Sequence, residues 1–154
     1  MYSTLELYID GRFIGAGPGR DSEPVQNPAT GAILAQLPHA TEAEVDEALA
    51  ASLRAFASWS QTNPLERSDI LRRAAGIMRE RMDALCRVTS LEQGKPLVES
   101  KGEWTHAIEI FEWSAEEGRR IYGRTIPSRF PNTEHIVLQE PVGELYEYKD
   151  DILL

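Results

Sequence analysis

A long helical pattern occupies residues 63–96, which read NPLERSDILRRAAGIMRERMDALCRVTSLEQGKP. Asn63 and Pro64 mark its start, because proline fits the first helical position, where its missing N–H would be unpaired in any case. Gly94 and Pro96 mark its end. Apolar residues between these marks recur every three or four positions, which predicts one amphipathic helix. Its apolar stripe consists of Leu71, Ala74, Ala75, Met78, Met82, Leu85, Cys86 and Thr89.

Two further amphipathic helices are expected, one on either side of this segment. Thr41 and Glu44 form a capping box, a pattern that starts a helix by pairing its free backbone N–H groups. The apolar face of that first helix holds Val45, Ala48, Leu49, Ser52, Phe56 and Trp59. The last helix is expected to end with Arg119 and Arg120, whose charges suit the helix dipole, with Gly123 just beyond. Its apolar face holds Trp104, Ile108, Phe111, Ala115 and Tyr122.

The two ends of the chain have the pattern of β-strands. Apolar residues alternate with polar ones up to Asp10-Gly11, a dipeptide typical of a type I′ hairpin turn. Residues 27–31, Asn-Pro-Ala-Thr-Gly, predict another turn, and residues 32–37 a short strand after it. Residues 135–139 predict an extended segment near the other end. The expected fold class is therefore α+β: an N-terminal β-hairpin and short strands, three amphipathic helices, and one or more C-terminal extended strands.

The composition excludes several classes of function. The formal net charge is −9 and no cluster of lysine and arginine occurs, which counts against binding to nucleic acid or to an anionic membrane surface. No run of apolar residues is long enough to span a bilayer, and the N-terminus does not have the pattern of a signal peptide. A single cysteine leaves no intramolecular disulfide to form. We expect a cytoplasmic protein.

Cys86 is the one thiol that could act as a nucleophile. It lies on the apolar stripe of the central helix, between Met82 and Thr89, where a cysteine behaves as a small hydrophobic residue. A thiol buried in such a setting is unreactive. We therefore interpret Cys86 as a core residue and not as a catalytic one.

Other residues that could carry chemistry have simpler interpretations. His39, His106 and His135 are too scattered along the chain to predict a metal site. Gly15, Gly17 and Gly19 do not have the GxGxxG spacing of a dinucleotide cradle, and an antiparallel hairpin precedes them. Several glutamates share one side of the last helix and are interpreted as a solvated helix face: Glu99, Glu103, Glu109, Glu112 and Glu116.

The order of the short motifs resembles the N-terminal portion of the aldehyde dehydrogenase family. The motifs are Leu7-Tyr8-Ile9-Asp10-Gly11, Asn27-Pro28-Ala29-Thr30-Gly31, Ala55-Phe56 with Trp59, Leu91-Glu92-Gln93-Gly94-Lys95-Pro96, Glu112-Trp113 with the segment from Ala115 to Gly123, and Glu140-Pro141-Val142-Gly143. Each motif is common alone, and their shared order carries the resemblance. The segment Ala115-Glu116-Glu117-Gly118-Arg119-Arg120 is most similar to the succinate-semialdehyde dehydrogenase branch.

The resemblance implies oxidation of an aldehyde to the carboxylic acid with NAD or NADP. In the family a cysteine thiolate attacks the carbonyl, hydride passes to the nicotinamide, and a glutamate activates the water that cleaves the thioester. Those residues and the cofactor site follow the Pro-Val-Gly strand in the family, and the setting of Cys86 does not resemble the catalytic loop. We therefore expect this chain to contain no catalytic, cofactor-binding or metal-binding residue, and to bind no NAD or NADP by itself.

The similarity to the family stops at Gly143, so we divide the chain into residues 1–143, a partial aldehyde dehydrogenase N-terminal region, and residues 144–154, a divergent tail. The tail reads ELYEYKDDILL. It is compatible with a frameshifted or truncated gene, with an appended tail, or with an internal deletion that joins the family's extreme C-terminus.

Two hypotheses for the whole chain follow. In the first, it is the N-terminal portion of an aldehyde dehydrogenase and is inactive alone. In the second, it is a non-catalytic scaffold or oligomerisation module. Helix faces that pack on further sequence in the family would expose apolar patches here, so we expect an oligomer or a fragment of modest stability. The expected partner is a second copy of the chain or a full-length subunit.

Overall fold

The computed structural model describes residues 4–143, which form four helices and six short strands. The helices are α1 (Glu42–Trp59), α2 (Pro64–Glu80), α3 (Met82–Gln93) and α4 (Leu97–Gly118). The strands are β1 (Glu6–Ile9), β2 (Arg12–Gly15), β3 (Ser22–Gln26), β4 (Ile33–Pro38), β5 (Arg124–Pro127) and β6 (Glu134–Val137). The α+β fold class is confirmed. The expected divergent tail, residues 144–154, lies outside the described residues.

The starts of the helices follow the expected signals. Thr41 and Glu44 form the capping box at the start of α1. The side chain of Asn63 accepts a hydrogen bond from the backbone N–H of Glu66, and Pro64 occupies the first turn of α2. The Thr41 and Asn63 side chains each accept from a backbone N–H group that has no partner within its helix.

The central helix expected over residues 63–96 is two helices rather than one. The chain breaks at Arg81, whose backbone (φ −98°, ψ 9°) leaves the helical region and caps both α2 and α3. The apolar residues keep the same spacing on both sides of Arg81, because α2 and α3 both pack on α4. The sequence pattern therefore does not show where one helix ends and the next begins. The prediction of three helices was wrong on this point.

The last helix is also shorter than expected. It ends at Gly118, and Ile121 and Tyr122 lie beyond it as exposed residues. Glycine inside a helix costs about 1 kcal/mol relative to alanine, so Gly118 is a favourable place for α4 to stop.

Each strand pairs with its sequence neighbour, giving three separate two-stranded antiparallel sheets: β1–β2, β3–β4 and β5–β6. Asp10 and Gly11 both have positive φ (47° and 76°), as the predicted type I′ turn requires. Strands β3 and β5 were not expected. Each is short and contains a proline, Pro24 or Pro127, which removes a backbone donor and is typical of edge strands.

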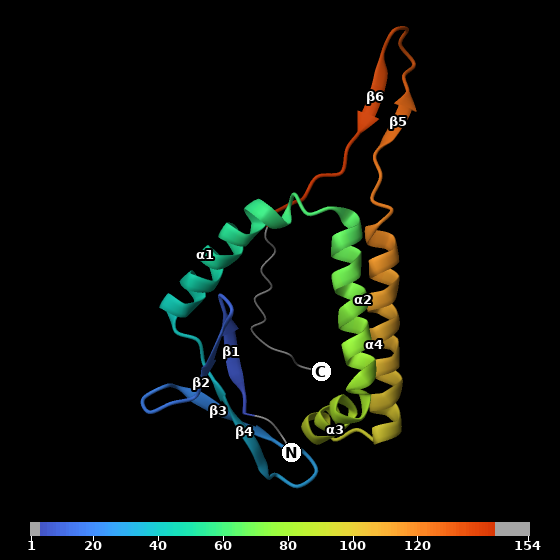
Figure 1. The fold of residues 1–154 in the computed structure, drawn as a ribbon. Coiled ribbons are helices and arrows are strands. Elements are labelled where there is room, and N and C mark those ends of the chain that lie inside the picture. Colours follow the sequence, from blue (N-terminus) through green and yellow to red (C-terminus); the bar gives the residue numbers. More distant parts are fainter. Residues whose placement is uncertain (1–3, 144–154) are drawn as a thin grey trace.

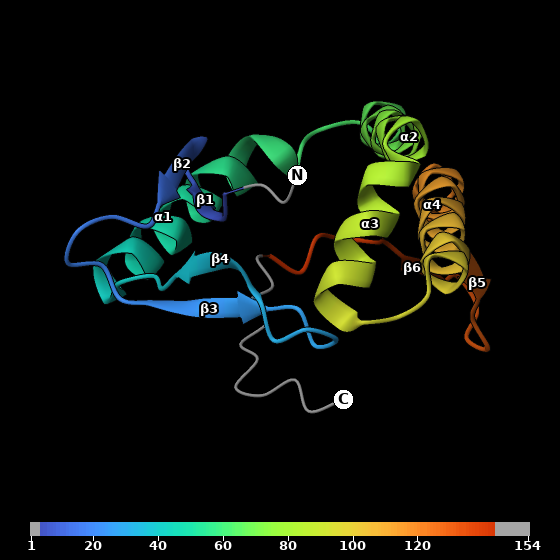
Figure 2. The same cartoon turned by 90° about the horizontal axis from the view of Figure 1, so that it is seen from below.

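The elements form two groups, as Figures 1 and 2 show. Strands β1–β4 and α1 lie on one side of the molecule, and α2, α3 and α4 lie on the other. The β5–β6 hairpin extends beyond the end of α4 (Figure 1). The groups approach each other where Gly94 closes α3 with φ +72°, since a Cβ on Gly94 would lie 3.0 Å from Cγ of Pro28.

The buried core lies mainly in the helical group. Small side chains dominate it, and α4 packs along both α2 and α3. The buried residues on these helices are Ser68, Ala75, Cys86, Ser100, Ile108 and Ala115. Two polar contacts join α3 to α4: Trp104 Nε1 donates to Thr89 Oγ1 at 2.9 Å, and the hydroxyls of Ser90 and Ser100 lie 3.0 Å apart.

Helix α1 is held differently, because it has no buried residue. Ion pairs join it to the β-strands and to the loop between them: Arg54 to Asp10 at 3.1 Å, Arg20 to Glu44 at 2.5 Å, and Arg12 to Glu47. The Arg20 hydrogen bond and the Thr41 backbone N–H lower the pKa of Glu44 to about 2. Because the pKa of Glu44 is lower in the folded chain than in the unfolded one, its ionised carboxylate stabilises the fold at a pH above about 4.5. This stabilisation is lost as the pH falls from about 4.5 towards 2.

None of the helices described between residues 4 and 143 has both the length and the apolar character needed to cross a bilayer.

Two buried serines give a matched test of the helical core. The Ser68 hydroxyl is 1% exposed and has no hydrogen-bond partner, whereas the Ser100 hydroxyl is paired with Ser90. A buried hydroxyl without a partner costs about 1–3 kcal/mol, and a paired one contributes about 1 kcal/mol. We expect Ser68→Ala to raise the free energy of unfolding by about 1 kcal/mol and Ser100→Ala to lower it. Urea denaturation followed by circular dichroism measures both; a loss of stability in Ser68→Ala would contradict the packing described.

Candidate functional site

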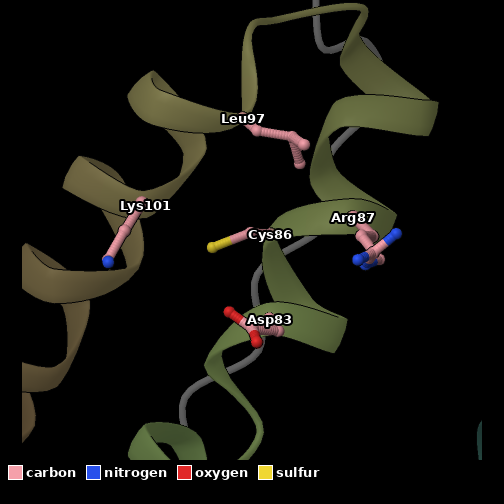
Figure 3. A pocket seen from close by; sticks show the side chains of 5 residues that line it. All are labelled: Asp83, Cys86, Arg87, Leu97 and Lys101. Carbon is pink, nitrogen blue, oxygen red and sulfur yellow. The ribbon is translucent and has the colours of Figure 1, made fainter.

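Cys86 lies on α3 at the seam with α4 and is 5% exposed, so its expected burial is confirmed. Figure 3 shows its sulfur pointing towards α4, between Leu97 and Lys101. Helix α3 presents the residue to this seam because the chain turns at Arg81 and lays α3 against α4. The place of Cys86 on the apolar stripe therefore correctly predicted that it faces the interior.

The surroundings of Cys86 are more polar than the sequence pattern indicated. The sulfur lines a pocket of about 180 Å³ together with Asp83, Arg87, Leu97 and Lys101. In Figure 3 the Asp83 carboxylate lies one turn before Cys86, the Lys101 ammonium group projects from the opposite helix, and the Arg87 side chain points away from the sulfur. The charged side chains lie at the mouth of the α3–α4 seam, a position that helical periodicity does not reveal.

The contacts of the Cys86 sulfur bear on whether it could act as a nucleophile. A nucleophilic thiolate requires a base within hydrogen-bond reach and donors that stabilise the oxyanion. Within the range 4–143 the Cys86 sulfur makes no hydrogen bond with another residue, and none of the three histidines lines the pocket. The burial of Cys86 is confirmed, whereas its low reactivity as a thiol stays a prediction.

The three histidines lie apart, as expected from their spacing. His39 follows β4, 3.3 Å from an Asp21 oxygen and 3.7 Å from a Glu23 oxygen. His106 lies on α4 near Glu109, and His135 lies in β6. Within the described part of the chain, no three His, Cys, Asp or Glu residues are placed to hold a metal ion.

The glutamates of α4 form an ion-paired helix face. Glu112 pairs with Arg79 at 2.9 Å and Glu116 with Arg72 at 2.5 Å, which ties α4 to α2. Glu103 pairs with Lys95 at the start of the helix. The two pairs with α2 are largely exposed to solvent, so each contributes little to stability. These ion pairs agree with the interpretation of the face as a solvated one.

A second pocket, larger than the one beside Cys86, also has no signal in the sequence. It has a volume of about 710 Å³ and is formed where the α1–α2 link, the end of α4 and residues 139–142 meet. Arg67, Trp59, Gln61, Ile121 and Gln139 are among its lining residues. Because these segments are far apart in the chain, no local pattern marks the site.

Comparison with known proteins gives a consistent result. The sequence model of the aldehyde dehydrogenase family matches residues 16–146. The glutarate-semialdehyde dehydrogenase of Pseudomonas aeruginosa is 41% identical over 138 residues, covering 90% of this chain and 28% of that protein. The NADP-dependent succinate-semialdehyde dehydrogenase GabD of Escherichia coli is 42% identical over 138 residues, again covering 90% of this chain and 28% of that protein.

Solved structures agree with these relatives. The succinate-semialdehyde dehydrogenase of Burkholderia pseudomallei superposes with a TM-score of 0.83 and 37% identity, covering 90% of this chain and 29% of that one. A betaine aldehyde dehydrogenase of Staphylococcus aureus in complex with NAD⁺ gives a TM-score of 0.80 at 28% identity, covering 91% of this chain and 28% of that one.

The family is NAD(P)-dependent, but the described residues do not fit a dinucleotide. Such a site uses a glycine-rich turn between a parallel strand and a helix, where the helix N-terminus receives the pyrophosphate. The sheets described here are antiparallel pairs; Gly15 ends β2, and Gly17 and Gly19 lie in the link between β2 and β3.

The chain spans about 28% of the length of the curated relatives it matches. It corresponds to their N-terminal portion, and the small strand pairs and helices make up a partial N-terminal domain. With the family's pattern matched across most of its residues and its fold shared with solved members, this chain belongs to the aldehyde dehydrogenase family.

Proposed function

We propose that this chain is the N-terminal portion of an NAD(P)-dependent dehydrogenase that oxidises succinate semialdehyde or a close analogue to the carboxylic acid. The family match over residues 16–146 carries this proposal. The choice of substrate is supported by relatives at 41–42% identity that are named for glutarate and succinate semialdehyde.

The proposal includes that the chain has no dehydrogenase activity alone. In the family reaction a thiolate adds to the aldehyde carbonyl, hydride leaves for the oxidised nicotinamide, and water releases the acid from the thioester. The surroundings of Cys86 support the absence of this chemistry, since among residues 4–143 its sulfur has no side-chain hydrogen bond and no histidine lines its pocket. The antiparallel sheets support the further proposal that this chain binds no NAD or NADP by itself.

A second candidate function is that of a scaffold or oligomerisation module. The observation in its favour is the amount of apolar side chain that the structure leaves exposed. Helix α1 has no buried residue, and Trp113 on α4 is 70% exposed. Exposed apolar patches favour association. We propose that the partner is a second copy of the chain or a full-length subunit of the same family.

We also propose that the chain acts in the cytoplasm. It has a single cysteine, so no intramolecular disulfide contributes to its stability.

An activity assay tests the first proposal. The purified chain is incubated with succinate semialdehyde and either NAD⁺ or NADP⁺, and nucleotide reduction is followed by absorbance. We expect no rate of nucleotide reduction above that of buffer. Full-length E. coli GabD under the same conditions is the positive control. Turnover by the chain that disappears in Cys86→Ser would show that Cys86 is a nucleophile and would overturn the proposal.

A mixing experiment tests the scaffold function. Tagged chain is combined with untagged full-length E. coli GabD, and the mixture is analysed by affinity capture and by light scattering. We expect either a stable homo-oligomer of the chain or capture of the full-length enzyme. Leu53→Lys and Trp113→Lys, which place charges on exposed apolar positions of α1 and α4, are expected to reduce association. A monomer at high concentration that captures nothing would exclude this function.

A further inference from the structure

Arg67 is an unusual cation in this structure. Among the lysine and arginine residues described, three are partly buried: Arg20, Arg67 and Lys95. Arg20 is paired with Glu44, and Lys95 with Glu103. The Arg67 side chain has no ion pair and no hydrogen bond to any residue in the described range. The other two partly buried cations are thus paired, and Arg67 is the exception among the residues described.

Arg67 lines the pocket of about 710 Å³ where the α1–α2 link meets residues 139–142. The pocket also contains two amide side chains, Gln61 and Gln139, that make no hydrogen bond with another described residue. Its apolar lining comes from Trp59, Ile121 and Val142, all of them exposed in this structure. Pockets for small molecules combine an apolar lining with a few polar or charged groups that orient the ligand, and a cation beside two amides is suited to an anionic group.

The charge of the pocket restricts the ligand further. Arg67 contributes one positive charge, and Glu140 contributes a negative charge to the same lining. A second negative charge on the ligand would meet the Glu140 carboxylate, since Arg67 is the one cation among the lining residues. The apolar wall gives inorganic phosphate no complementary surface. The pocket therefore fits a monoanion with an apolar part better than a dianion or a bare inorganic ion.

We propose that this pocket binds an organic monocarboxylate with a short apolar tail. The planar guanidinium of Arg67 offers two parallel N–H donors to the carboxylate, an arrangement that lysine does not provide. The tail lies against Trp59 and Ile121, and the amides of Gln61 and Gln139 satisfy the remaining carboxylate lone pairs. This site is separate from the semialdehyde oxidation proposed above and does not depend on it.

The test uses the full chain with hexanoate as the probe. Trp59 lines the pocket, whereas Trp104 and Trp113 do not, so of the three indole N–H resonances in an NMR titration that of Trp59 is a local reporter and that of Trp113 an internal control. We expect hexanoate to shift the Trp59 signal in a saturable way and to leave Trp113 unchanged. 1-Hexanol has the same tail without charge, and adipate has a second carboxylate; both are expected to bind about tenfold more weakly or worse. Inorganic phosphate is expected to leave Trp59 unshifted.

Two arginine variants separate the site from non-specific charge effects. Arg67→Gln is expected to weaken hexanoate binding by at least about tenfold, because a charge-assisted hydrogen bond is lost. Arg73→Gln, an exposed arginine on the same helix outside the pocket, serves as the matched control and is expected to bind normally. Circular dichroism verifies that each variant folds. If Arg67→Gln does not fold, Arg67→Lys replaces it, with a severalfold loss expected because the paired donors are absent.

Three results would overturn the proposal. The first is a wild-type chain whose Trp59 resonance does not respond to hexanoate. The second is equal binding of hexanoate and 1-hexanol, which would show that the carboxylate is not recognised. The third is hexanoate affinity that is unchanged in Arg67→Gln, or in Arg67→Lys where that variant is used.

Discussion

The close packing of α4 against α2 is the contact on which the described structure depends. Most of the buried residues on these two helices are small: Ser68 and Ala75 on α2, and Ser100 and Ala115 on α4, with Ile108 on α4 as the larger one. Small side chains let two helix backbones approach closely and lose little side-chain entropy on burial. Helix α3 then docks on the same α4 through Ser100 and through the hydrogen bond between Trp104 and Thr89. The position of Cys86 in the α3–α4 seam and of Arg67 near the start of α2 both follow from this arrangement.

The remaining elements have a weaker attachment. Helix α1 has no buried residue and is joined to the β-strands by solvent-accessible ion pairs, the best shielded being Arg20 with Glu44. The β5–β6 hairpin extends beyond α4 with two strands alone, and an isolated two-stranded sheet is marginally stable in water (Figure 1). A chain that spans about 28% of its relatives thus has one well-packed helical group and several elements with exposed apolar surface. This contrast is what supports the proposed association with a partner.

The sequence predicts those parts of the structure that local signals control. The type I′ turn at Asp10-Gly11, the capping box of α1 and the start of α2 at Pro64 each depend on residues next to one another, and all three are present. The break at Arg81 was not predicted, because the apolar stripe stays in phase when two consecutive helices pack on the same partner. Strands β3 and β5 were missed because their pairing comes from the neighbouring strand and not from their own alternation.

The same distinction applies to the candidate sites. The burial of Cys86 follows from its place on a helix face and was predicted, but the nearby Lys101 comes from another helix and was not. The pocket around Arg67 combines residues 59–67, Ile121 and residues 139–142, which only the folded chain brings together. The family resemblance was also readable from the sequence, because it depends on the order of short motifs along the chain and not on which residues the fold brings together.

Hydrogen–deuterium exchange on the full chain tests the central claim most directly, since it measures the local stability of each helix. The structure predicts that backbone amides of α2 and α4 around Ala75 and Ala115 exchange most slowly, and that those of α1 exchange much faster. Amides of α1 that are protected as strongly as those of α2 and α4 would show that the α2–α4 contact is not the foundation of this fold.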